Sequence, residues 1–148
     1  MLWFVGLGIG GPDSLSEKTK KIISDANMVY FEQFTSPMKN DESQRIREIA
    51  KGEFKFAPRW LVEDGKEILD SAKTKSIVMV SYGDPYIATT HIELRTRATQ
   101  EKIQTYTVHA PSAITSLIGE CGLHYYKVGR TVTIMSGIPS STAYYAIY

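Results

Sequence analysis

Residues 76–81 read SIVMVS, an uninterrupted apolar run between two serines, and the turn Gly83-Asp84-Pro85 follows directly. Successive side chains of a strand point to opposite faces of its sheet, so a strand that is apolar throughout must be covered on both faces. Strands of this kind are typical of parallel sheets that lie between two layers of helices. The run therefore predicts a central strand of a parallel sheet, ending at a Gly-Asp-Pro turn.

Short apolar runs alternate with helical patterns along the rest of the chain. We expect further strands at residues 2–5, 28–31, 54–57, 106–109 and 132–135. We expect helices from Ser14 onward, at 45–50, at 61–72, after the Gly-Asp-Pro turn and after Pro111. Such alternation indicates βαβ units, whose right-handed crossovers place helices on both faces. The predicted fold is α/β, with a doubly wound, mostly parallel sheet and helices on both faces.

The sequence also predicts details of the first and last of these helices. Ser14 is expected to cap the first helix, and Glu17 three residues later would complete a capping box. In the last helix, one apolar side is formed by Ile114, Leu117, Ile118 and Cys121. We expect Cys121 to be a buried small hydrophobe there, not a nucleophile.

Composition limits the possible functions. The 148 residues carry a formal net charge of +1, which gives no electrostatic argument for binding nucleic acid or a membrane surface. A single cysteine excludes an internal disulfide and favours a reduced, intracellular location. No apolar stretch approaches the ~20 residues of a membrane span, and the histidines are too scattered for a metal site. We expect a soluble cytoplasmic protein without a metal.

Three loops should meet at the edge of the sheet where the strands end: residues 6–12, 83–87 and 109–113. Ligands of doubly wound sheets bind at this edge. The first loop, GLGIGG, fits the dinucleotide motif G-x-G-x-x-G, with Glu32 as a possible ribose partner, so a nicotinamide-binding domain is one alternative. In that motif the helix begins within the glycines, whereas Pro12 and Asp13 delay it here. A turn that needs glycine only to reverse the chain is another alternative.

The other two loops each allow a structural and a ligand-binding interpretation. Asp84 could cap the following helix, or it could present a carboxylate to a cationic ligand from a rigid turn. His91 shares an apolar helix side with Ile87, Leu94 and Ala98, which favours a core histidine bonded to a carbonyl. In HAPSAI, Pro111 and Ser112 suit a helix start, and a helix that begins at this edge presents free amide groups to it.

GLGIGG, YGDPYIATTHIELRTRA and HAPSAITSLIGECGLHYYKVGRTVTI together resemble the diphthine synthases, a family of the tetrapyrrole-methylase-like class. The resemblance runs through essentially the whole chain, and its most specific part is GDPYIATTH. It implies a tetrapyrrole methylase-like amino-terminal domain that binds S-adenosyl-L-methionine and releases S-adenosyl-L-homocysteine. The cofactor contacts that it implies are Ile9, Asp84, Ile87, Ser112 and Ala113.

The resemblance also implies a reaction and partners. The reaction is methylation of the 3-amino-3-carboxypropyl group on a histidine of translation elongation factor 2, the methylation stage of diphthamide biosynthesis. The expected partners are elongation factor 2, as protein substrate, and a second copy of the chain in a homodimer. Members of the family are longer, so residues 1–136 would form the cofactor-binding domain and 137–148 the start of the connection to a second α/β domain.

The sequence is compatible with more than one catalytic arrangement and more than one function. The sequence identifies no catalytic base, and Tyr30, Glu32 and His91 are only candidate neighbours of the site. Besides the nicotinamide-binding domain, the alternatives are a methylase of the same class that acts on a tetrapyrrole ring, and a non-enzymatic fragment that only dimerises.

Overall fold

The structure, a computed structural model, describes residues 1–35, 40–134, 137, 141 and 144–145. It divides into two compact units, Met1–Thr115 and Ser116–Tyr148, which are described separately. The first unit contains a five-stranded sheet in which every strand pair is parallel. The strands are β1 (Leu2–Gly6), β2 (Met28–Glu32), β3 (Glu53–Ala57), β4 (Ile77–Ser81) and β5 (Thr105–Val108).

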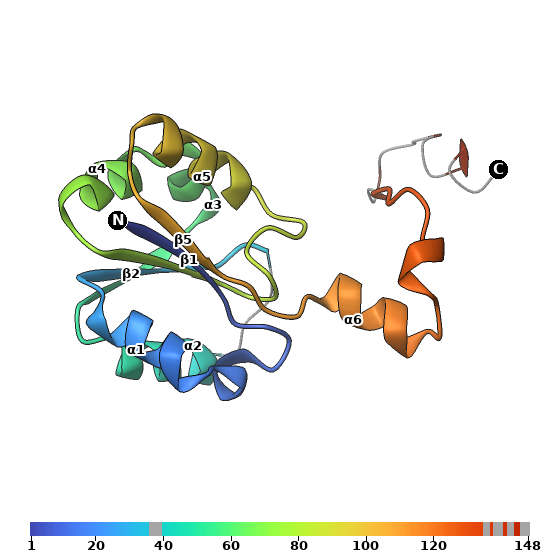
Figure 1. Cartoon of the computed structure of the whole chain (residues 1–148), viewed down its shortest axis with the longest axis horizontal. Coiled ribbons are helices and arrows are strands. Elements are labelled where there is room, and N and C mark those ends of the chain that lie inside the picture. The colour runs from blue at the N-terminus through green and yellow to red at the C-terminus, as the bar shows by residue number, and fades with distance from the viewer. Residues whose placement is uncertain (36–39, 135–136, 138–140, 142–143, 146–148) are drawn as a thin grey trace. The chain divides into compact units, whose positions relative to one another are not determined.

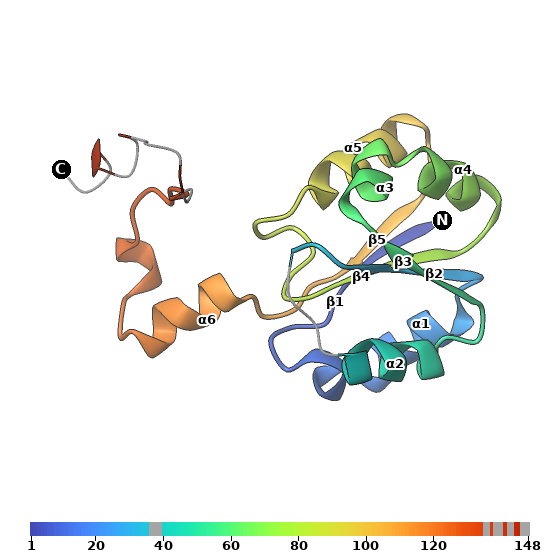
Figure 2. The ribbon, with the colours of Figure 1, turned by 180° about the vertical axis from the view of Figure 1, so that it is seen from behind.

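Helices cover both faces of this sheet (Figure 1). The helical segments are η1 (Gly11–Ser14), α1 (Glu17–Asp25), α2 (Asn40–Ile49), α3 (Arg59–Asp64), α4 (Lys66–Thr74), α5 (His91–Gln100), α6 (Ala113–Glu120) and η2 (Tyr125–Lys127). In both views, α1 and α2 lie on one face and α3, α4 and α5 on the other (Figure 2). The predicted doubly wound α/β fold is therefore confirmed.

The strand order β3-β2-β4-β1-β5 explains why the helices divide between the two faces of the sheet. The connections from β1 to β2 through α1 and from β2 to β3 through α2 run toward the β3 edge. The connections from β3 to β4 through α3 and α4 and from β4 to β5 through α5 run toward the β5 edge. Because parallel crossovers are right-handed, opposite directions place the helices on opposite faces. The neighbouring strands β1 and β4 therefore send their chains to opposite sides, which opens a crevice at their carboxyl ends.

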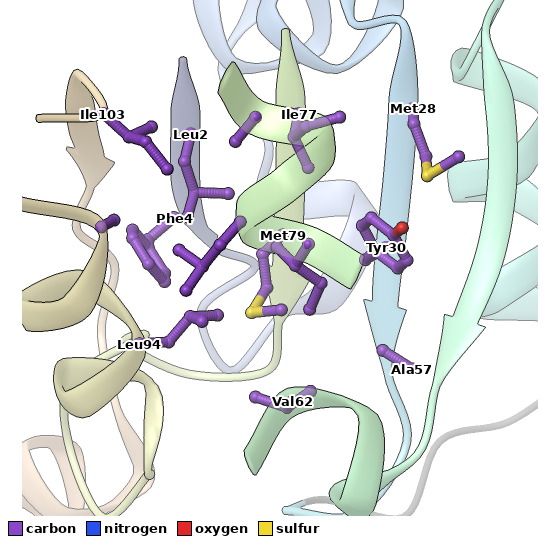
Figure 3. Packing of buried hydrophobic residues seen from close by; sticks show 14 of the residues in the cluster. Leu2, Phe4, Met28, Tyr30, Ala57, Val62, Ile77, Met79, Leu94 and Ile103 are labelled. Atoms are coloured by element: carbon purple, nitrogen blue, oxygen red, sulfur yellow. The ribbon is translucent and has the colours of Figure 1, made fainter. Parts of the chain in front are cut away.

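The two faces of β4 belong to two separate hydrophobic clusters. Ile77 and Met79 pack with α3, α4 and α5, while Val78 and Val80 pack with α1 and α2. Figure 3 shows Met79 and Ile77 beside Leu2, Phe4 and Tyr30 in the first of these clusters. All five residues of β4 are buried, as the apolar run predicts. The central strand is thus fixed by packing on both sides.

Two helix predictions are wrong in detail. The cap of α1 is Ser16, which accepts a hydrogen bond from the Thr19 amide at 3.2 Å, because Ser14 is already the last residue of η1. The helix predicted at 61–72 is broken between α3 and α4 by Gly65, whose φ is +64°. A Cβ at Gly65 would lie 2.6 Å from Leu94 Cδ1, so the break also allows α5 to pack closely.

The structure corrects two further predictions near the end of the chain. Cys121 is exposed and follows the end of α6, and Leu117 is 58% exposed. The apolar spacing identifies one side of a helix but does not specify what covers it. Residues 132–134, predicted as part of a strand, form no regular secondary structure, and Met135 lies outside the described residues. The predicted domain boundary after residue 136 remains a prediction.

Candidate functional site

A cavity of about 210 Å³ opens at the carboxyl edge of the sheet, within the unit Met1–Thr115. It is lined by residues from the four loops that follow β1, β2, β4 and β5: Gly8, Ile9, Thr35, Tyr82, Gly83, Asp84, Ile87, Ala88, Thr89, Ser112, Ala113 and Ile114. The five residues predicted as cofactor contacts, Ile9, Asp84, Ile87, Ser112 and Ala113, all lie in this lining. Sequence reasoning placed three of the four loops correctly and missed the loop that contributes Thr35.

Glycines bring the first two loops together. The Gly8 amide donates to the Gly83 carbonyl at 3.2 Å, and the Gly83 amide donates to the Gly8 carbonyl at 3.1 Å. Both residues have a positive φ, +68° and +61°, which glycine adopts without strain. A Cβ on Gly6 would clash with the Gly83 carbonyl and lie 3.0 Å from Ala110 Cβ. The first loop therefore needs glycine for its own geometry and also lines the cavity.

Asp84 joins the loop after β4 to the loop after β5. It is 6% exposed, and its Oδ1 accepts a hydrogen bond from the Tyr86 amide at 2.9 Å. Its Oδ2 accepts from the Ala110 amide at 3.3 Å and lies 2.7 Å from His109 Nδ1. Helix α5 begins only at His91, after Thr90, so Asp84 stabilises the turn and does not cap the helix.

The start of α6 supplies the last wall of the cavity. Ser112 is buried, and its Oγ accepts a hydrogen bond from the Thr115 amide at 3.2 Å. In return, the Ser112 amide donates to Thr115 Oγ1 at 3.2 Å. The first amides of a helix have no partner within the helix. In α6 these include the amides of Ala113 and Ile114, two residues that line the cavity.

Glu32 holds the loop after β2 from behind the cavity. Its Oε1 accepts hydrogen bonds from the amides of Phe34 and Thr35, both at 2.6 Å, and its Oε2 accepts from Thr35 Oγ1. The carboxylate is buried and is used to fix Thr35 in the lining. It is therefore not presented to a ribose, which argues against the nicotinamide-binding alternative.

His91 is a core histidine, as predicted. Its ring has no exposed surface, and its Nδ1 lies 3.0 Å from the Pro85 carbonyl. Its Nε2 lies 3.8 Å from Glu32 Oε2. Burial lowers the pKa of His91, and this effect exceeds the opposing effects of the Glu32 charge and the Pro85 carbonyl. The neutral ring is therefore hydrogen bonded to the loop after β4 and lies close to Glu32 of β2 without a hydrogen bond to it.

None of the three candidate bases is among the described residues that line the cavity. Tyr30 lies in the core, where its hydroxyl donates to Glu67 Oε1 at 2.8 Å, and burial raises its pKa. Two of the lining residues are titratable, Tyr82 and Asp84. Burial and the neighbouring Glu42 raise the pKa of Tyr82 to about 12, and the Asp84 carboxylate is already engaged by the amides of Tyr86 and Ala110. Tyr82 is therefore a neutral phenol at physiological pH. The lining can bind and orient a ligand better than it can accept a proton.

Two features are absent from the part of the chain that the structure describes. Within them, no cluster of three or more His, Cys, Asp or Glu side chains is arranged to hold a metal ion. No helix in the same residues has the length and apolarity needed to cross a bilayer.

Comparison with known proteins gives a family match. Residues 1–145 match the family described as Tetrapyrrole (Corrin/Porphyrin) Methylases. The chain belongs to this family. Among its relatives, the diphthine synthase of Archaeoglobus fulgidus is 31% identical over 134 residues, which cover 90% of the chain and 53% of the relative. The diphthine methyl ester synthase of Saccharomyces cerevisiae is 32% identical, and the match covers 91% of the chain and 45% of the relative.

The fold comparison agrees. A crystal structure of diphthine synthase superposes with a TM-score of 0.86 at 31% identity, covering 99% of this chain and 58% of the other chain. The chain therefore spans about half the length of the curated relatives that it matches. The family match, over residues 1–145, spans all four loops of the cavity.

Gly6→Ala tests the close approach of the loops. The added methyl group would push Gly83 away from β1, so we expect a loss of about 1–3 kcal/mol in the free energy of unfolding. Chemical denaturation of both proteins measures it. Gly119→Ala in α6 is the matched control, because a Cβ there meets nothing within 4 Å. Equal stability of the Gly6→Ala variant and the unaltered chain would contradict the described packing.

His91 should make stability depend on pH. Its pKa is lowered in the folded state, so below the ordinary value of about 6.5 the unfolded chain binds more protons than the folded one. Stability should therefore fall as the pH drops from 7.5 to 5.5, and His91→Gln should reduce this dependence. Denaturation curves at both pH values measure it, with exposed His124→Gln as control. An unchanged pH slope in His91→Gln would refute the assignment.

Proposed function

We propose that this chain forms the cofactor-binding part of an S-adenosyl-L-methionine-dependent methyltransferase. Its substrate would be the 3-amino-3-carboxypropyl-histidine of translation elongation factor 2, as in diphthamide biosynthesis. The observation that carries the proposal is the convergence of four loops on one cavity at the β1/β4 crevice. The relatives named above support the substrate, because they are diphthine synthases and a diphthine methyl ester synthase.

The chemistry of the lining fits this cofactor. S-adenosyl-L-methionine has an aromatic base, a sulfonium and an ammonium group. Ile9, which is 58% exposed, and Ile87 offer apolar contact to the base. A carboxylate has about four acceptor positions, and three donors face Asp84, so one position is left for a cationic or amino group of the ligand. The cofactor also carries a carboxylate, to which the free amides of Ala113 and Ile114 at the start of α6 offer donors.

The size of the cavity fits a partial site. Sites for small molecules are usually about 300–1,000 Å³, whereas the cavity formed by the described residues is about 210 Å³. The matched relatives are about twice as long, which supports a second domain that completes the site. In this proposal, residues 137–148 begin the connection to that domain.

When bound, the cofactor would supply an activated methyl group for in-line displacement by the acceptor nucleophile, with the sulfur keeping the electron pair of the broken bond. The task of the protein is to align donor and acceptor and to exclude water. The rigid loops serve this task, since each is fixed by hydrogen bonds behind the cavity. An amine acceptor also loses a proton, and we assign that proton to solvent or to residues outside the lining.

The assembly and location are part of the same proposal. The protein would act in the cytoplasm as a homodimer, with elongation factor 2 as its protein substrate. Neither nucleic acid nor membrane is involved. A formal net charge of +1 is in keeping with this set of partners.

Transfer of a radiolabelled methyl group to elongation factor 2 bearing the modified histidine tests this proposal. Both the chain and a version extended through a second domain are assayed, and we expect label with the extended version. Asp84→Ala should lower the affinity for S-adenosyl-L-homocysteine at least ~10-fold in calorimetry, because a charged acceptor and a loop anchor are lost together. Asp70→Ala, at an exposed ion pair with Lys73, is the matched control.

Two outcomes would contradict the proposal. Absence of label with both versions would reject the substrate. Binding of a porphyrin precursor, seen as an absorbance change in titration, together with no label on elongation factor 2 would favour a tetrapyrrole substrate instead.

A further inference from the structure

His109 lies at the end of β5 and touches the cavity only through Asp84. Its Nδ1 is 2.7 Å from Asp84 Oδ2, and its side chain is 68% exposed. It does not appear in the cavity lining; it borders a separate groove of about 180 Å³ on the other side of the loop, together with Gly8, Ser16 and Pro111. Asp84 therefore stands between the cavity and the His109 ring.

The hydrogen bonds around Asp84 indicate which ring nitrogen of His109 acts as the donor. An ionised carboxylate only accepts hydrogen bonds, and the amides of Tyr86 and Ala110 already donate to it. The third neighbour, His109 Nδ1, must therefore carry a proton. In the neutral ring, Nε2 is then unprotonated, which is the opposite of the tautomer that a free histidine prefers.

Tyr86 holds the same ring from a second direction. The rings of Tyr86 and His109 meet edge to face, with centroids 5.8 Å apart. The Tyr86 hydroxyl is 2.8 Å from Thr107 Oγ1 on β5, and its amide donates to Asp84 Oδ1. His109 is thus fixed on one side by a carboxylate and on the other by an aromatic ring, both from the loop after β4.

We infer that His109 is a positioning residue: its Nδ1–H holds the Asp84 carboxylate and keeps the loops after β4 and β5 in the arrangement that forms the cavity. The two loops are otherwise joined at Asp84 by the Ala110 amide, whose 3.3 Å bond is the longer one. Loss of the His109 bond should release this amide and loosen the wall at Ser112. The consequence for cofactor binding rests on the proposed function, whereas the contact itself does not.

Two measurements without ligand test this role. Long-range ¹H–¹⁵N spectra of the chain should show His109 as the Nδ1–H tautomer, while exposed His124, stacked on Tyr126, serves as the internal reference with the ordinary Nε2–H form. Amide exchange at Ala110 should be about tenfold faster in His109→Ala. His109→Asn, whose amide can donate from nearly the position of Nδ1, should restore slow exchange.

Calorimetry with S-adenosyl-L-homocysteine then connects the contact to the cavity. We expect the affinity to fall roughly fivefold to tenfold in His109→Ala and to recover in His109→Asn. An Nε2–H tautomer of His109, or unchanged exchange at Ala110 in His109→Ala, would overturn the inference. If His109→Ala does not fold, the tautomer in the unaltered chain decides. If the unaltered chain shows the expected tautomer and exchange but binds no S-adenosyl-L-homocysteine, the proposed function fails and the positioning contact stands.

Discussion

Beyond the last residues of β1 and β4, the two segments exchange one more pair of backbone hydrogen bonds, between Gly8 and Gly83. This bridge lies where the chain turns away toward opposite faces of the sheet, so it joins two loops that the topology would otherwise separate. It requires glycine at both positions and no side chain at Gly6. The cavity exists because the backbones approach this closely, and its lining follows from the bridge.

Buried polar groups make this arrangement rigid. Asp84, Glu32 and His91 are all buried, and each is hydrogen bonded to the backbone or side chains of a loop that lines the cavity. A buried polar group is costly unless it is paired, so each loop is held in the one conformation that pairs it. Glu32 and His91 therefore shape the site from behind, whereas Asp84 both anchors its loop and lines the cavity beside glycine, aliphatic and hydroxyl-bearing residues.

The sequence predicted the sheet well because its strands are defined by burial on both faces, as in residues 76–81. It also predicted the edge at which the loops gather, since parallel strands end together. The start of α1 at Ser16 and the break at Gly65 depend on a short 3₁₀ turn and on packing against α5, which spacing alone does not encode. The exposure of Cys121 shows that periodicity identifies an apolar side without naming its partner.

One lining residue and one contact of the site were not predicted from the sequence. Thr35 was not singled out, and its place in the lining depends on hydrogen bonds to Glu32, three residues before it. His109 lies in the predicted loop 109–113, but its contact with Asp84 joins residues 25 positions apart. The end of a predicted strand was a usable signal for both. What could not be read from the sequence was which hydrogen bonds those side chains form.

Whether the four loops form a binding site for S-adenosyl-L-methionine is tested most directly by backbone amide chemical shifts during titration with S-adenosyl-L-homocysteine. We predict saturable changes at the amides of Gly8, Ile9, Gly83 and Ala113, with the amides of Ile68 and Leu69 in α4 unchanged. Absence of saturable changes at the four loops, or changes confined to another part of the surface, would contradict the assignment of this cavity.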